Sequence, residues 1–159
     1  VLDCGCGGGA NIKTLLKLCP NGKVQGIDYS AVSVEKAQKV NARAIAAGRC
    51  TVQQASVAEL PFEAEQFEVV TAFETVYFWP ELVQNFREVY RVLKPGGIFF
   101  ICNEANGETA KDDKWTQIIN GMTIYTDTAL KAYLEQAGFC KIQSHKNKKG
   151  WLCITARKR

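Results

Sequence analysis

The sequence predicts an α/β domain in which helices cover both faces of a mostly parallel sheet, the doubly wound architecture. Two observations carry this prediction. Short apolar segments typical of buried strands alternate along the chain with amphipathic segments of helical period. Near the end the alternation stops, because two strand-like segments follow one another across a short polar loop. The alternation implies parallel strands joined by right-handed crossovers, and the closing hairpin implies one antiparallel strand.

The first half of the chain is expected to hold three strands and two helices. The strands are predicted at residues 1–3, 24–27 and 51–54. Apolar residues at helical spacing predict a first helix over residues 12–19, and the turn at residues 20–22 ends it. A second helix is predicted to begin after Ser30 as its N-cap and to end at Gly48.

The second half is expected to hold four strands and three helices. The strands are predicted at residues 67–73, 98–102, 139–145 and 151–157. The first of these is almost continuously apolar, as expected for a central strand that is buried on both faces. The helices are predicted at residues 82–93, 115–119 and 130–137, with Thr126 capping the last one and Gly138 ending it.

Composition bounds the class of protein. The chain has 159 residues, of which 47% are hydrophobic and 23% charged, as in an ordinary globular domain. No apolar segment approaches the ~20 residues that a membrane-spanning helix needs. The net charge of +4 is small, and a solvated hairpin and tail account for the basic residues near the end. We therefore expect one domain over residues 1–159, no membrane span and no nucleic-acid partner.

Two further features bear on the cellular setting. The seven cysteines are odd in number and lack the paired spacing of a zinc site, so we expect reduced thiols, no metal site and a cytoplasmic protein. The chain opens directly on a strand at Val1, which leads us to expect a domain truncated at its N-terminus.

A glycine-rich loop follows the first strand and opens the first helix. The segment from Asp3 to Gly9 reads Asp-Cys-Gly-Cys-Gly-Gly-Gly, and glycines allow a tight turn and close approach of a ligand to the backbone. The second strand ends in Asp28, roughly 20 residues further on, where a carboxylate can accept hydrogen bonds from both hydroxyls of a ribose. Together these features predict a site for a nucleoside-containing cofactor at the carboxyl ends of the strands.

Asp3 separates two classes of cofactor. The segment from Gly5 to Ala10 also satisfies the loose fingerprint of dinucleotide-binding proteins. The carboxylate of Asp3, however, would repel a pyrophosphate at the mouth of the loop and would attract an ammonium group, directly or through water. The residues therefore favour a cofactor with an amino-acid moiety over NAD.

Four segments together resemble the class I S-adenosylmethionine-dependent methyltransferases, in particular their small-molecule, UbiE-like type. They lie in the order and spacing of that family, at residues 1–9, 26–30, 58–62 and 93–97. The resemblance covers nearly the whole chain. It implies a Rossmann-like seven-stranded sheet of order 3-2-1-4-5-7-6 with strand 7 antiparallel, and S-adenosylmethionine as cofactor.

The resemblance also implies roles for individual residues around this cofactor. At its amino-acid end it places the loop residues Asp3, Gly5, Cys6 and Gly7, together with the carbonyl of Phe73. At its nucleoside end it places Asp28 on the ribose and Tyr29, Ser56 and Val57 around the adenine. Family members commonly carry an acidic residue at the position of Ser56, so the adenine contacts are expected from the Ser56 hydroxyl and the Val57 backbone instead.

The segment after the fourth strand is expected to face the methyl acceptor. Glu74 and Tyr77 are the candidate catalytic residues, and at least one of Tyr77, Phe78 and Trp79 is expected to line the acceptor pocket. Glu104 is a further candidate for a general base or for binding a cationic acceptor. The only histidine, His145, falls in the terminal hairpin and is expected to be solvated.

The implied reaction is direct displacement of a methyl group from S-adenosylmethionine by an acceptor, expected to be a small molecule. The protein would mainly align the acceptor and exclude water. Two alternatives stay open at this point: an NAD(P)-dependent oxidoreductase, and a catalytically inactive cofactor-binding or scaffold domain.

Overall fold

A single seven-stranded sheet organises the chain. The computed structural model describes residues 1–108 and 110–159, and its strands lie in the order β3-β2-β1-β4-β5-β7-β6. The strands are β1 (Leu2–Cys4), β2 (Val24–Asp28), β3 (Cys50–Gln54), β4 (Phe67–Phe73), β5 (Leu93–Asn103), β6 (Cys140–Lys146) and β7 (Leu152–Arg157). Neighbours pair in parallel from β3 to β5, whereas β7 is antiparallel to both β5 and β6. The predicted strand order and the antiparallel strand are confirmed.

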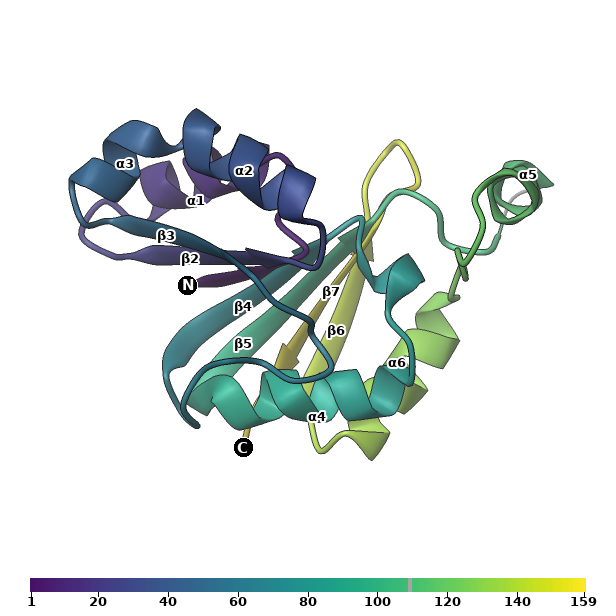
Figure 1. The fold of residues 1–159 in the computed structure, drawn as a ribbon. Helices are drawn as coiled ribbons and strands as arrows, with labels where there is room; N and C mark the ends of the chain where they lie inside the picture. Colours follow the sequence, from purple (N-terminus) through teal and green to yellow (C-terminus); the bar gives the residue numbers. More distant parts are fainter. Residues whose placement is uncertain (109) are drawn as a thin grey trace.

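Helices cover both faces of the sheet. They are α1 (Ala10–Leu18), α2 (Ala31–Val40), α3 (Ala42–Ala46), α4 (Leu82–Val92), α5 (Ala110–Ile118) and α6 (Asp127–Gln136). In Figure 1, α1, α2 and α3 lie on one face beside β2 and β3, and α4 and α6 lie on the other face below β4 and β5. Helix α5 stands apart from the sheet, beyond the carboxyl ends of β4 and β5 (Figure 1). The doubly wound architecture is thus confirmed.

Local sequence signals place several helix ends. The Ser30 hydroxyl accepts a hydrogen bond of 3.3 Å from the Ser33 backbone N–H at the start of α2. The Thr126 hydroxyl does the same for the Ala129 N–H, at 3.2 Å, at the start of α6. Each cap gives a backbone N–H of the first turn, which has no partner within the helix, a hydrogen-bond acceptor. Both predicted N-caps are confirmed.

Three predicted elements differ in the structure, and one of them is α5, which begins at Ala110 instead of residue 115. The helix expected to run on to Gly48 is broken at Asn41, whose buried side chain donates to the carbonyls of Gly9 and Ala37, both at 3.0 Å. This side-chain bonding competes with the helical pattern and ties α2 to the glycine loop. Strand β5 begins at Leu93 instead of residue 98, with an irregular register against β4.

The core contains a cluster of aromatic rings beneath the sheet. Trp79 stacks on Phe99 with ring centroids 6.2 Å apart and meets the edge of Phe86 at 6.0 Å. Only 6% of Trp79 is exposed. Trp79 therefore anchors the segment after β4 to α4 and β5, in addition to any contact with a ligand.

Two further properties concern the length of the helices and the state of the cysteines. No helix in the described ranges is both long and apolar enough to cross a membrane. All seven cysteines are free, and the sulfurs of Cys102 and Cys153 lie 3.4 Å apart across β5 and β7.

We expect Trp79→Ala to lower the free energy of unfolding by about 3–5 kcal/mol, because it empties a buried aromatic position. Urea unfolding followed by circular dichroism measures this change. Trp115→Ala is the matched control, since Trp115 on α5 is 50% exposed and its loss should change stability by only about 0.5 kcal/mol. Equal effects of the two substitutions would contradict the core role of Trp79.

Candidate active site

The glycine loop after β1 is held in place by backbone hydrogen bonds and by glycine conformations. The N–H groups of Gly5 and Cys6 donate to the Ile27 carbonyl at 2.8 and 2.9 Å. Gly5 has φ of 73°, and a Cβ added there would lie 2.1 Å from the Thr75 hydroxyl oxygen. Glycine is therefore required at this position, because the loop after β1 and the segment after β4 meet there.

Asp28 joins two segments at the end of β2. One carboxylate oxygen accepts a hydrogen bond from the Gly7 N–H and the other from the Ser30 N–H, each at 2.9 Å. The side chain thereby fixes both the glycine loop and the start of α2. Each oxygen retains a free lone pair, so Asp28 can still accept hydrogen bonds from a ligand.

Asp3 lies buried beneath the same loop with an incomplete set of partners. It is only 1% exposed, and its Oδ1 atom accepts a hydrogen bond of 2.7 Å from the Thr71 hydroxyl. Its Oδ2 atom has no hydrogen-bond partner among the described residues. Burial, and to a smaller extent the nearby carboxylate of Asp28, raises the pKa of Asp3 to about 6 against the opposing effect of the Thr71 hydrogen bond. A cationic group beside Asp3 would fit this unpartnered carboxylate.

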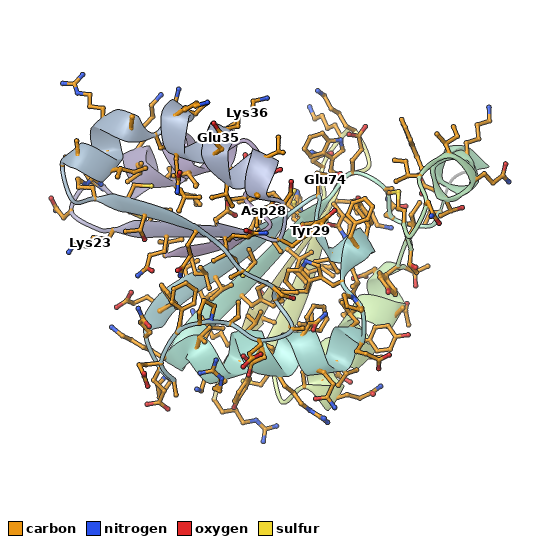
Figure 2. All side chains as sticks on the ribbon, viewed as in Figure 1. Lys23, Asp28, Tyr29, Glu35, Lys36 and Glu74 are labelled. Atoms are coloured by element: carbon orange, nitrogen blue, oxygen red, sulfur yellow. The ribbon has the colours of Figure 1, made fainter. Side chains whose placement is uncertain are left out.

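A cavity of about 410 Å³ opens above these residues, within the size range of small-molecule sites. We name it the first cavity. Its walls come from the ends of β1, β2 and β3, the segment after β4, and Gly121: Gly5, Ile27, Asp28, Tyr29, Ala55, Ser56, Val57, Thr75, Phe78, Trp79, Pro80 and Gly121. Tyr29 is 78% exposed at its rim. Figure 2 shows Asp28 and Tyr29 at the end of the sheet where Glu74 also lies.

The first cavity gathers five of the predicted cofactor residues. These are Gly5, Asp28, Tyr29, Ser56 and Val57. The remaining four lie outside its lining. Asp3 lies buried beneath the loop, Gly7 belongs to the loop and donates its N–H to Asp28, and the Cys6 side chain is buried in the core beside Ile12. The Phe73 ring packs on Phe100 at 5.7 Å, so any ligand contact of Phe73 would come from its backbone.

Glu74 and Tyr77 form a connected pair on the other side of Phe78. The Glu74 carboxylate accepts hydrogen bonds from the Glu104 N–H and, at 3.3 Å, from the Tyr77 hydroxyl. The Tyr77 oxygen also accepts a bond of 2.9 Å from the Ala105 N–H. Partial burial raises the pKa of Glu74 despite these hydrogen bonds, and burial together with the Glu74 charge raises the pKa of Tyr77. The pair connects the segments after β4 and β5.

A second cavity, of about 250 Å³, adjoins this pair. It is lined by Glu74, Tyr77, Phe78, Glu104, Ala105, Trp115, Ile119 and Met122. Phe78 is 43% exposed and lines both cavities, so it separates them. The structure thus brings Glu74, Tyr77 and Glu104 together, while His145 is exposed on β6, away from both linings.

Several residues of these cavities were not predicted from the sequence. Thr75 contacts Gly5 and accepts a hydrogen bond from the Trp79 indole N–H at 3.2 Å. Trp115, Ile119 and Met122 face the second cavity from α5 and the turn after it. Their apolar spacing could have indicated a face turned toward a site.

Within the described ranges no group of three or more His, Cys, Asp and Glu side chains is placed to hold a metal ion.

Comparison with known proteins places the chain among methyltransferases. Residues 2–101 match the family described as "Methyltransferase domain". Cycloartenol-C-24-methyltransferase of Arabidopsis thaliana is 30% identical over 148 residues, which are 87% of this chain and 44% of that protein. Cycloartenol-C-24-methyltransferase 1 of Oryza sativa subsp. japonica is 32% identical over 101 residues, covering 64% of this chain and 29% of the relative. The chain therefore spans less than half the length of these relatives.

A solved structure shares the fold. The SAM-dependent methyltransferase from Aquifex aeolicus superposes with a TM-score of 0.84 at 20% identity, covering 99% of this chain and 81% of that one. The likeness extends over the antiparallel hairpin as well as the parallel strands, because nearly all of the chain is included.

We expect Asp3→Asn to stabilise the ligand-free protein at neutral pH. Since the pKa of Asp3 is raised to about 6 on folding, ionisation of this group costs stability, from nothing at about pH 3 to about 3 kcal/mol above pH 7. Urea unfolding at several pH values should show the free energy of unfolding of the variant rising relative to that of the wild type between about pH 3 and pH 7. A difference between the two proteins that does not change with pH would contradict the raised pKa of Asp3.

Asp112→Asn is the control for this experiment. Asp112 is also buried, but its Oδ2 atom accepts hydrogen bonds from the N–H groups of Asn106 and Gly107, at 3.2 and 2.8 Å. Removing a charge that has such partners should give no gain in stability at neutral pH.

Proposed function

The chain belongs to the methyltransferase domain family, and we propose that it transfers a methyl group from S-adenosylmethionine to a small-molecule acceptor. The observation that carries this proposal is the first cavity, which Asp28 and the glycine loop border above the buried carboxylate of Asp3, whose Oδ2 atom has no hydrogen-bond partner among the described residues. When bound there, S-adenosylmethionine supplies a methyl group already activated by the positive charge of its sulfonium. The residues of the chain have to bind, orient and shield the reactants.

The nucleoside end of the cofactor suits the first cavity. Asp28 offers two oxygens to ribose hydroxyls, and the exposed ring of Tyr29 offers a face for adenine. Ser56 and Val57 line the same wall. We propose that these four residues hold the nucleoside, with Gly5 allowing close approach of the backbone.

The amino-acid end suits the region of Asp3. An ammonium group near Asp3, directly or through water, would offset the cost of its buried charge. We propose that the loop residues Cys6 and Gly7 take part through their backbone only, and that the Phe73 carbonyl accepts a hydrogen bond from the ammonium. The match of residues 2–101 to the methyltransferase family disfavours the NAD-type oxidoreductase, as does Asp3, whose carboxylate would repel a pyrophosphate.

We propose that the acceptor lies in the second cavity, separated from the cofactor by Phe78. Glu74 then faces the acceptor, and a carboxylate whose pKa is raised toward neutrality is suited to take up a proton. Tyr77 acts as a positioning residue, since its hydroxyl binds both Glu74 and the Ala105 backbone.

The names of the plant relatives make an apolar sterol a second candidate acceptor, favoured by the exposed apolar side chains of Phe78, Trp115 and Ile118 at this end of the molecule.

Isothermal titration calorimetry tests the cofactor assignment. We expect S-adenosylhomocysteine to bind and NAD not to bind. Asp28→Asn should weaken S-adenosylhomocysteine binding at least about tenfold, because a hydrogen bond to a charged oxygen contributes roughly 1.5–3 kcal/mol. Ser30→Ala is the control: it removes the α2 cap at a cost of about 1 kcal/mol in stability and leaves the carboxylate in place. Binding of NAD alone would overturn the proposal.

Substitutions at Glu74 and Tyr77 test the acceptor side. Glu74→Gln keeps one oxygen for the Glu104 N–H, so affinity for S-adenosylhomocysteine should stay within about twofold while methyl transfer falls roughly tenfold or more. Tyr77→Phe should lower the free energy of unfolding by about 1–3 kcal/mol, because the buried Ala105 N–H loses its acceptor. Full methyl transfer by the Glu74→Gln variant would show that Glu74 is not needed as a base, and that the protein accelerates the reaction by aligning the acceptor and the cofactor.

A further inference from the structure

Among the described residues, the charged side chains that line the second cavity all have the same sign. Glu74 and Glu104 contribute carboxylates, and none of the eight lining residues is a lysine, arginine or histidine. The other walls are aromatic or apolar. Placing a neutral apolar ligand against two carboxylates would remove water from them without replacing its hydrogen bonds. The lining therefore favours a ligand that brings a positive charge.

The Glu74 carboxylate is fixed in place before any ligand arrives. Its two oxygens accept hydrogen bonds from the Glu104 N–H and the Tyr77 hydroxyl, which belong to different segments. Each oxygen retains acceptor capacity beyond these bonds. Glu74 also has φ of 56°, a left-handed conformation that is unfavourable for a residue with a Cβ. The fold thus holds a carboxylate where glycine or asparagine would suit the backbone better.

Aromatic rings lie around these carboxylates. Phe78 and Trp115 are both partly exposed and line the cavity, and the Phe78 ring meets Tyr77 edge-on with centroids 6.1 Å apart. The face of an aromatic ring attracts an organic cation, most strongly for tryptophan. Carboxylates and ring faces together form an environment for an ammonium group attached to an apolar body.

We infer that the second cavity selects methyl acceptors that bind with a positive charge, as a protonated amine attached to an apolar or aromatic body. Where that nitrogen is the methylated atom, it first gives its proton to the Glu74 carboxylate; its lone pair then attacks the methyl group and S-adenosylhomocysteine leaves. This inference rests on the proposed function, which places the acceptor in this cavity. Ion pairing with Glu74 and Glu104 supplies the preference for charge, and Phe78, Trp115 and Ile119 contact the body of the ligand.

Three small probes of equal ring and chain length test the inference. Phenethylamine is a cation, 2-phenylethanol is neutral and 3-phenylpropanoate is an anion. Their binding is measured by titration calorimetry with the protein saturated with S-adenosylhomocysteine. We expect phenethylamine to bind at least about tenfold more tightly than the alcohol, and the anion to bind most weakly. Raising the salt concentration should reduce the preference for the amine.

Substitutions of the two glutamates test whether the preference for the amine arises in the second cavity. Glu74→Gln and Glu104→Gln should each weaken phenethylamine binding several-fold and leave binding of the alcohol unchanged. Glu135→Gln is the matched control, because it removes the same charge from an exposed position on α6 and should change neither.

Different results would overturn the proposed methyl transfer and the inferred selection of positively charged acceptors. Absence of S-adenosylhomocysteine binding to the wild type would overturn the proposed function itself. Normal S-adenosylhomocysteine binding with equal affinity for the amine and the alcohol would overturn the charge selection alone and favour an uncharged acceptor. An amine preference that both cavity variants retain in full would overturn the assignment to Glu74 and Glu104.

Discussion

The carboxylate of Asp28 is the interaction on which the first cavity depends. Its bonds to the N–H groups of Gly7 and Ser30 hold the glycine loop of β1 against the start of α2. Gly7 has φ of 50°, so without such a tie the loop would have many other conformations to adopt. Because Asp28 also lines the first cavity, the residue that shapes the site is positioned to bind within it.

Glu74 orders the second cavity as Asp28 orders the first, because its carboxylate also ties segments of the chain together. Its carboxylate joins the segments that follow β4 and β5, through the Tyr77 hydroxyl and the Glu104 N–H. Apolar packing cannot order these segments alone, since they lie beyond the ends of the strands, where backbone groups need polar partners. Two carboxylates at the same end of the sheet, Asp28 and Glu74 (Figure 2), therefore order the two cavities, and Phe78 lines both of them.

Sequence reasoning succeeded where the determining signal is local. Alternating periods, the caps at Ser30 and Thr126 and the terminal hairpin each lie within one or two elements, and they predicted the elements and the antiparallel strand. The strand order was implied by the resemblance to the methyltransferase family. It failed where a distant contact decides. The break at Asn41 depends on the Gly9 carbonyl, and the role of Thr75 depends on its closeness to Gly5. The Glu104 and Ala105 N–H groups that hold Glu74 and Tyr77 could be located only once β4 and β5 were paired.

The buried Asp3 and the partly exposed Glu74 show why the site is not the most stable arrangement that this fold could adopt. Asp3 has one oxygen without a partner in the described chain, and burial raises its pKa as it does that of Glu74. In both cases the ionised form is disfavoured by the fold itself. A cation that binds beside such a group removes that cost, so binding and stability are linked. The ligand-free protein is thus less stable for the same physical reason that it would bind positively charged groups well.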